Sequence, residues 1–139
     1  MSRTIKSRGK TVDEIRGGRW VYGSLVQLEG GGSFIVVGMS PSGILSYHEV
    51  DPATVGQFAE IRDCHGREIY ECDICTTLEI RHGRIEEGMG PIAWKDHMWV
   101  VCNLGTTETM LCVFDGKDSE EIEIIGNIHD NPELMAVHS

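Results

Sequence analysis

Cysteine and histidine gather in one stretch of the chain, where Cys64 and His65 precede a C-x-x-C formed by Cys72 and Cys75. Four such side chains could in principle bind zinc, and a C-x-x-C at a helix N-terminus can serve redox chemistry. A structural zinc site commonly has a second close pair of ligands, which is missing here. Residues 71–74 also lack a glycine or proline. We therefore expect a strand whose two thiols point to opposite faces and hold no metal ion.

Other catalytic patterns are missing from the sequence. It contains no G-x-S-x-G, no Walker loop and no dinucleotide-binding G-x-G-x-x-G followed by a helix. Glu121 and Glu123 alternate with Ile122 and Ile124, which is typical of the solvent face of a strand rather than of an acid/base pair. The sequence predicts a protein that is not an enzyme and needs no cofactor. A metal or redox protein using Cys64, Cys72 and Cys75 remains an alternative.

The elements that must position these residues are mainly β-strands. Residues 20–26 alternate, and the chain has 17 glycines in 139 residues, as expected for many turns between short strands. Asp51 before Pro52 and Asn131 before Pro132 predict one or two short helical turns, with the asparagine and the aspartate as N-caps. Residues 63–66 predict a tight turn with glycine in the left-handed position.

A hairpin is predicted around a four-residue loop, residues 95–98, which would set Trp94 directly opposite Trp99. The length suits one compact unit made of two small β subdomains, residues 1–60 and 61–139. The fold class is mainly β.

Charge is unevenly distributed along the chain. The net charge is −10, yet residues 1–19 hold six basic and two acidic residues, and the remainder carries a net of −14. A basic arm of this kind could contact nucleic acid, although the acidic body would repel it. The N-terminal residues do not form the apolar region of a secretory signal, and no apolar run is long enough to span a bilayer. These patterns predict a cytoplasmic protein with no membrane partner.

Four segments of the chain resemble the ordered signatures of the YopX family. They read I-K-S-R-G-K followed by W-V-Y-G-S-L-V, then V-D-P-A-T-V-G-Q-F, G-R-E-I-Y-E-C-D-I and I-I-G-N-I-H-D-N-P-E-L-M, and the resemblance runs from about Ile5 to Met135. It implies a small phage or prophage protein, β-rich, with a C-terminal part like an SH3-like barrel, no assigned molecular function and no catalytic residues to carry over. Family members usually read Y-E-G-D-I, so Cys72 stands where relatives carry glycine.

Aromatic residues are the candidate binding positions, because SH3-like barrels bind extended peptides on exposed aromatic side chains. The same residues could instead fill the core of a small β domain. The candidates are Trp20, Tyr22, Tyr70, Trp94 and Trp99.

Together these observations predict a non-enzymatic protein of the phage or prophage type in a bacterial host cell. Its partner is expected to be another protein, copies of itself in a homo-oligomer, or both. The alternative is a nucleic-acid accessory protein that uses the basic N-terminal arm.

Overall fold

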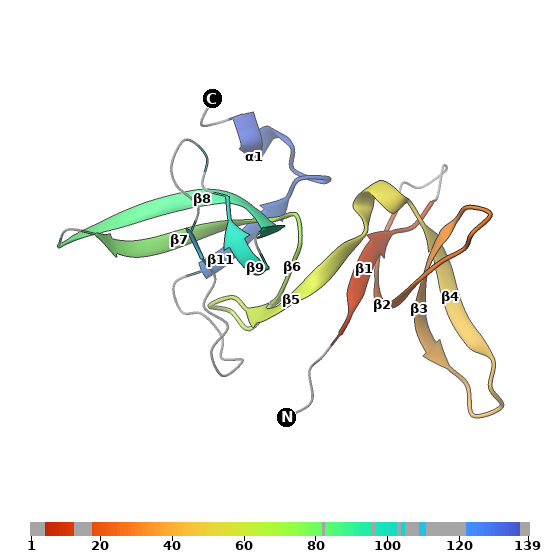
Figure 1. Ribbon diagram of the computed structural model, residues 1–139. Coiled ribbons are helices and arrows are strands. Elements are labelled where there is room, and N and C mark those ends of the chain that lie inside the picture. The colour runs from red at the N-terminus through yellow and green to blue at the C-terminus, as the bar shows by residue number, and fades with distance from the viewer. Residues whose placement is uncertain are drawn as a thin grey trace. The chain divides into compact units, whose positions relative to one another are not determined.

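The computed structural model describes residues 5–12, 18–81, 83–95, 97–102, 104, 109–110 and 122–136 (Figure 1). The chain is mainly β, as predicted, and its sheets are antiparallel. It divides into two compact units, Met1–Phe58 (unit 1) and Ala59–Ser139 (unit 2). No helix among these described residues is long and apolar enough to cross a membrane.

Unit 1 is a curled antiparallel sheet with the strand order β4-β3-β2-β1, followed by the start of β5. Thr11, just after β1, forms a bridge with Val50 at the end of β4, so the sheet curls until these two strands meet. The elements are β1 (Ser7–Lys10), β2 (Trp20–Gln27), β3 (Ser33–Met39), β4 (Leu45–Val50), the 3-10 helix η1 (Pro52–Thr54) and β5 (Gly56–Arg62), whose later residues belong to unit 2.

The core of unit 1 is small. Val21, Ile35 and Val50 are buried, and Leu25 and Val55 pack against them. The alternation in β2 is confirmed, because Val21 faces this core while Val26 and other residues of opposite parity are exposed.

Two glycines of unit 1 allow close approaches that no side chain would fit. A Cβ on Gly9 would lie 2.9 Å from the Val50 side chain, and a Cβ on Gly23 would lie 2.1 Å from the carbonyl oxygen of Val36. Gly23 therefore lets β2 approach the backbone of β3 closely.

The first predicted helical turn is confirmed as η1. The Asp51 carboxylate accepts a hydrogen bond from the backbone N–H of Ala53 at 3.0 Å, and Pro52 occupies the first helical position. The Thr54 hydroxyl accepts from the backbone N–H of Lys10 at 2.8 Å, which fastens the turn to β1.

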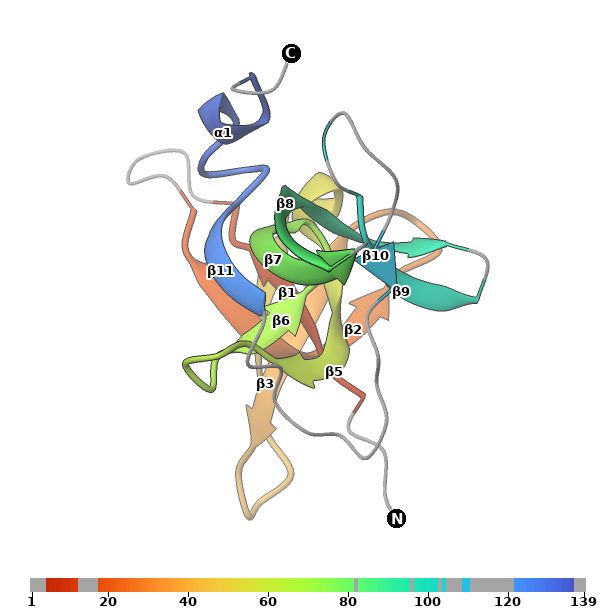
Figure 2. The ribbon, with the colours of Figure 1, turned by 90° about the vertical axis from the view of Figure 1, so that its left-hand side faces the viewer.

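Unit 2 contains a sheet with the strand order β10-β9-β8-β7-β11, and β6 lies beside β5. Figure 2 shows β11 leading into the short terminal helix α1. The elements are β6 (Glu68–Tyr70), β7 (Asp73–Arg81), β8 (Arg84–Lys95), β9 (Met98–Val101), β10 (Thr109–Met110), β11 (Ile122–Asn127) and α1 (Glu133–Ala136). The buried cluster is larger than that of unit 1: Ala59, Ile61, Ile69, Cys75, Ile92, Trp99, Val101 and Ile122. That this unit resembles an SH3-like barrel stays a prediction.

The predicted tryptophan pair is confirmed across β8 and β9. Trp94 lies directly opposite Trp99, with ring centroids 5.0 Å apart in an edge-to-face arrangement. The loop is shorter than expected, because Lys95 and Met98 still pair and His97 adopts a left-handed φ of 66°.

The expectation of an uninterrupted strand through the C-x-x-C is wrong. A turn at Glu71 and Cys72 separates β6 from β7, and Cys72 has a left-handed φ of 72°. The buried Asp73 carboxylate accepts a hydrogen bond from the backbone N–H of Tyr70 at 2.8 Å. Aspartate thus stabilises the turn that glycine or proline was expected to signal.

The terminal helix also departs from expectation in one detail. The Asn131 carbonyl accepts from the backbone N–H of Leu134, but its side-chain oxygen accepts from the backbone N–H of Asn127 at 3.2 Å. The side chain therefore ties α1 back to β11 instead of capping the helix.

Candidate functional site

One side of β2, β3 and β4 carries apolar side chains that are exposed or half-buried. In the strand register, Val26 pairs with Phe34, and Val36 pairs with Tyr47. Paired residues share a face of a sheet, and residues two apart on one strand share it too. The alternation that buries Val21 and Ile35 on one side therefore displays this set on the other.

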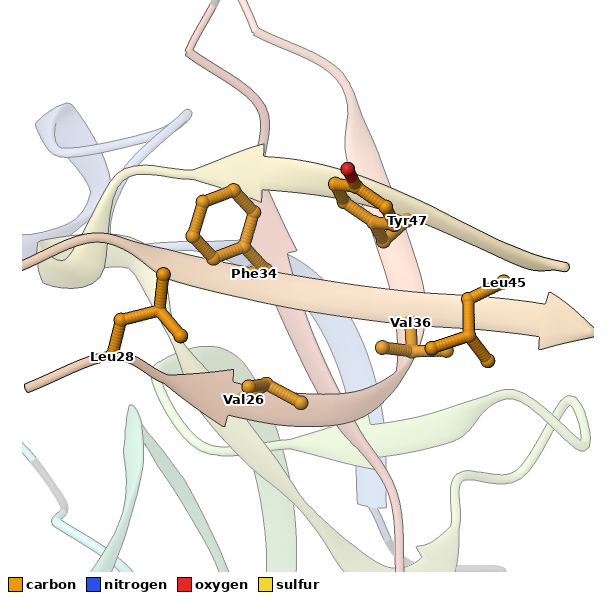
Figure 3. Close-up of a pocket in the computed structure, with 6 residues that line it drawn as sticks. All are labelled: Val26, Leu28, Phe34, Val36, Leu45 and Tyr47. Atoms are coloured by element: carbon orange, nitrogen blue, oxygen red, sulfur yellow. The ribbon is translucent and has the colours of Figure 1, made fainter.

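Six of these side chains line a pocket of about 260 Å³ and all project from the same side of the strands (Figure 3). The rings of Phe34 and Tyr47 meet edge to face at 5.8 Å. Leu28 is 54% exposed and Tyr47 is 59% exposed. We call this surface the apolar face; it consists of Val26, Leu28, Phe34, Val36, Leu45 and Tyr47.

A β-bulge extends the apolar face toward the tip of the hairpin. The register shifts between Val36 and Gly38, which places Met39 opposite Leu45. Met39 and Ile44 are both about two-thirds exposed. A cluster of exposed apolar side chains of this size on a soluble protein usually marks an interaction surface.

The described part of the basic arm is folded against aromatic rings. The Arg8 guanidinium lies 4.4 Å from the centre of the Trp20 ring, and the Lys10 ammonium lies 6.0 Å from it. Lys6 lies over Phe58 at 5.6 Å. Arg8 is buried, so it cannot reach a phosphate without leaving this cation–π contact. Residues 1–4 and 13–17 of the arm lie outside the described residues.

The predicted aromatic binding residues fall into different environments. Tyr70 and Trp99 are buried, so they pack the interior and cannot contact a partner directly. Trp20 is half-buried beneath Arg8, whereas Tyr22 and Trp94 are nearly half exposed. The structure brings Trp94 and Trp99 together, as predicted, while Trp20 and Tyr22 share a face of β2. Burial removes Tyr70 and Trp99 from the list of direct contacts.

In unit 2 a buried carboxylate organises the turn between β5 and β6. The Asp63 side chain accepts hydrogen bonds from the backbone N–H groups of His65, Arg67 and Ile124 at 2.9–3.1 Å. The Arg67 side chain pairs with the same carboxylate at 2.9 Å and donates to the Ile124 carbonyl at 2.8 Å. The predicted tight turn is confirmed, with Gly66 at a φ of 79°. This network fixes the turn to β11.

The ionisation of Asp63 reflects this network. Burial alone would raise the pKa of the carboxyl group, since it removes water from the charged form. Hydrogen bonds from the backbone of Arg67, Ile124 and His65 and from the Arg67 side chain outweigh that effect and hold the pKa below its usual value. Asp63 is therefore a charged structural centre at neutral pH.

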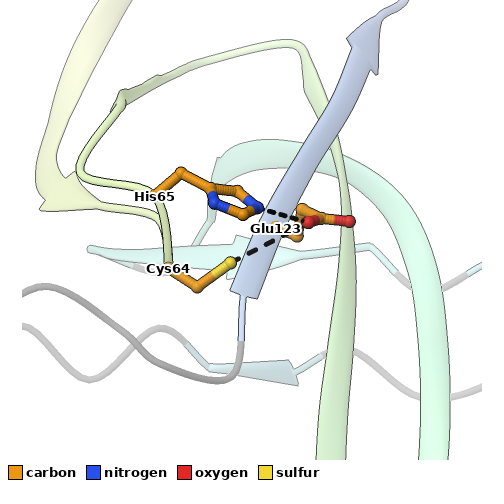
Figure 4. Close-up of side chains that lie close together, drawn as sticks. All are labelled: Cys64, His65 and Glu123. Atoms are coloured by element: carbon orange, nitrogen blue, oxygen red, sulfur yellow. Dashed lines mark hydrogen bonds and ion pairs between the residues drawn. The ribbon is translucent and has the colours of Figure 1, made fainter.

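The same turn and β11 bring three side chains of metal-ligand type close together (Figure 4). His65 Nε2 lies 2.6 Å from Glu123 Oε2, and Cys64 Sγ lies 4.0 Å from that oxygen. Desolvation, together with the negative charges of Asp63 and Glu123, raises the pKa of the Cys64 thiol. A protonated thiol is a poor nucleophile, which weakens the case for redox chemistry here.

The fold does not assemble the combination of Cys64 with Cys72 and Cys75 that the alternative metal or redox hypothesis used. Cys75 is fully buried in the apolar core of unit 2, whereas Cys64 is exposed. In the described ranges, the one group able to surround an ion is Cys64, His65 and Glu123.

Sequence reasoning missed both the apolar face and Glu123. Alternation identified two faces in β2 but gave no sign of which face the rest of the chain would leave uncovered. Glu123 was assigned correctly to the solvent side of a strand. Its approach to Cys64, however, depends on pairing between segments about sixty residues apart. No local sequence pattern indicates that pairing.

The fold defines a mainly-β protein with two compact units. The family model described as YopX protein matches residues 17–136, and the chain belongs to the YopX family. Its structure is similar to the crystal structure of protein EF1440 from Enterococcus faecalis, with a TM-score of 0.56 and 21% identity, over 96% of this chain and 99% of that one. No curated protein matches the sequence. At that identity the likeness concerns the fold alone. Cys72 has a left-handed backbone, so its position suits the glycine that the family resemblance led us to expect there.

Proposed function

We propose that this protein is a non-enzymatic interaction module whose apolar face binds a second copy of the chain. The observation that carries the proposal is the apolar face itself, where six apolar side chains converge on one pocket in a single exposed sheet face. Burying such side chains against a matching face gains roughly 25 cal/mol per Å² of apolar surface removed from water.

The distribution of charge favours a second copy as the occupant. Residues 1–58 contain six basic and five acidic residues, whereas residues 59–139 contain six basic and seventeen acidic ones. Two copies that meet through unit 1 bring together nearly neutral surfaces, while contact through unit 2 opposes like charges. In a two-fold arrangement the apolar face of one copy would bind the same face of the other copy. Such an interface needs no separate partner.

The family places the proposal in context. We propose that the protein is encoded by a phage or prophage and acts in the cytoplasm of its bacterial host, where a self-associating module could assemble without export. The basic arm does not favour a nucleic-acid partner, since Arg8 and Lys10 already contact Trp20.

Sedimentation velocity of the full chain over a wide concentration range tests the proposal. The mass of the wild-type protein should rise with concentration, and Leu45→Glu, which places a charge on the apolar face, should stay monomeric. The matched control is Leu78→Glu, at a similarly exposed leucine on β7 of unit 2, which should associate like the wild type. A wild-type protein that is monomeric throughout, or a Leu45→Glu variant that associates equally well, would refute the proposal.

A further inference from the structure

The turn between β5 and β6 carries a site of a different kind from the apolar face. Cys64 and His65 supply a thiol and an imidazole from that turn, and Glu123 supplies a carboxylate from β11 (Figure 4). We propose that these three side chains bind a divalent transition-metal ion of the zinc class. The proposal does not depend on self-association through unit 1.

The donor set selects the class of ion. Sulfur and imidazole nitrogen are ligands that zinc and its neighbours prefer, whereas magnesium and calcium take oxygen ligands. Zinc sites with three protein ligands commonly keep a fourth position for water. His65 and Glu123 have side chains 58% and 45% exposed, so water can reach the ion from solvent.

The spacing of the donor atoms is close to what such an ion needs. All three ligand atoms lie within 4.8 Å of one another. In a tetrahedral site with bonds of about 2.0–2.3 Å, ligand atoms are roughly 3.3–3.8 Å apart. The distances of 2.6 Å from His65 Nε2 to Glu123 Oε2 and 4.0 Å from Cys64 Sγ to the same oxygen bracket that range. Binding would therefore widen the separation of His65 Nε2 and Glu123 Oε2 and shorten that of Cys64 Sγ and Glu123 Oε2.

The backbone holds the two halves of the site together. The backbone N–H of Cys64 donates to the Ile122 carbonyl at 2.8 Å, and the buried Asp63 carboxylate accepts from the backbone N–H of Ile124 at 3.1 Å. Both neighbours of Glu123 are thus bonded to the turn that carries the other two ligands. A site whose ligands are positioned by buried hydrogen bonds loses little freedom when the ion binds.

Two carboxylates lie near the position that the ion would take. Glu123 and Asp63 both place negative charge near the Cys64 thiol. The nearby Arg67 forms an ion pair with Asp63. On binding, the thiol proton passes to solvent and the sulfur bonds to the ion. The dication is then bound by the Cys64 thiolate and the Glu123 carboxylate, whose negative charges balance its own.

Cobalt titration of the metal-free full chain tests the site directly, because a thiolate bound to Co²⁺ gives a near-ultraviolet charge-transfer absorption. The absorption should saturate at one equivalent, disappear in Cys64→Ser, and be displaced by Zn²⁺ but not by Mg²⁺. Glu123→Gln and His65→Ala should each weaken binding by at least about tenfold.

The matched controls are Cys72→Ser, a thiol in another turn of the same unit, and Glu133→Gln, an exposed carboxylate in α1; both should bind like the wild type. Thermal unfolding without metal shows whether each variant is folded, and Zn²⁺ should raise the melting temperature of the wild type but not of Cys64→Ser. Failure to saturate, or binding as tight as that of the wild type in Cys64→Ser or Glu123→Gln, would overturn the proposal and leave the contact as a surface ion pair.

Discussion

Unit 1 and unit 2 differ in net charge, in the size of the buried core and in the apolar surface that they expose. Unit 1 is nearly neutral, buries three residues in its core cluster and leaves a broad apolar face open. Unit 2 is strongly acidic, buries eight residues in its core cluster and adds a buried charged network at Asp63. Unit 2 has the larger buried core, whereas unit 1 exposes the apolar surface that the proposed function uses for association.

The largest expected effect comes from removing the charged centre of unit 2. Asp63→Ala leaves three backbone N–H groups and the Arg67 side chain without their acceptor, so we expect the free energy of unfolding to fall by about 3–5 kcal/mol. Chemical denaturation measures the loss, and hydrogen exchange should locate it in unit 2. A loss equally large in the exchange of unit 1 would contradict the separation of the two units.

Acidic pH should remove the stabilisation that the Asp63 carboxylate provides. Because folding lowers the pKa of Asp63 below its ordinary value of 3.8, the charged carboxylate stabilises the fold above that pH. The contribution is lost as the pH falls from there through the lower pKa of the folded state. With a chelator present, the stability difference between wild type and Asp63→Ala should therefore be constant near neutral pH and shrink below about pH 4. A difference that instead grew on acidification would contradict the assignment.

In unit 1 the corresponding weak point is a backbone contact. Gly23→Ala places a methyl group 2.1 Å from the Val36 carbonyl oxygen, which forces β2 and β3 apart. We expect a loss of about 2–3 kcal/mol, seen by hydrogen exchange in unit 1. Gly38→Ala is the control, because a Cβ there meets no atom within 4 Å. Equal losses for the two variants would rule out this role for Gly23.

The smallest expected effect is a gain. Cys72→Gly removes the strain of a side chain at a φ of 72°, and we expect the free energy of unfolding to rise by about 0.5–1 kcal/mol. Cys72→Ala keeps the strain and should give no gain. If both variants destabilise the protein equally in denaturant titrations, the Cys72 side chain itself contributes to packing.

The sequence supported the prediction of local features better than that of distant contacts. The cap at Asp51, the turn ending at Gly66 and the pairing of Trp94 with Trp99 each depend on residues within a few positions of one another, and all three are confirmed. The turn at Cys72 was missed because the Asp73 carboxylate, which accepts a hydrogen bond from the Tyr70 backbone N–H, stabilises it in place of the usual glycine or proline.

The sites depend on longer-range geometry. Cys64 meets Glu123 only because Asp63 and Arg67 align the turn with β11. The apolar face becomes recognisable only when the register of three strands is known, since each strand alone shows an ordinary alternation.

The central claim is that association occurs through the apolar face of unit 1. Methyl NMR of the full chain over a concentration series tests it most directly, because it reads both units in one sample. The methyl signals of Val26, Leu28, Val36 and Leu45 should shift or broaden as concentration rises, while that of the exposed Leu78 in unit 2 stays unchanged. Signals that stay constant in both units, or that change equally at Leu78, would contradict the account.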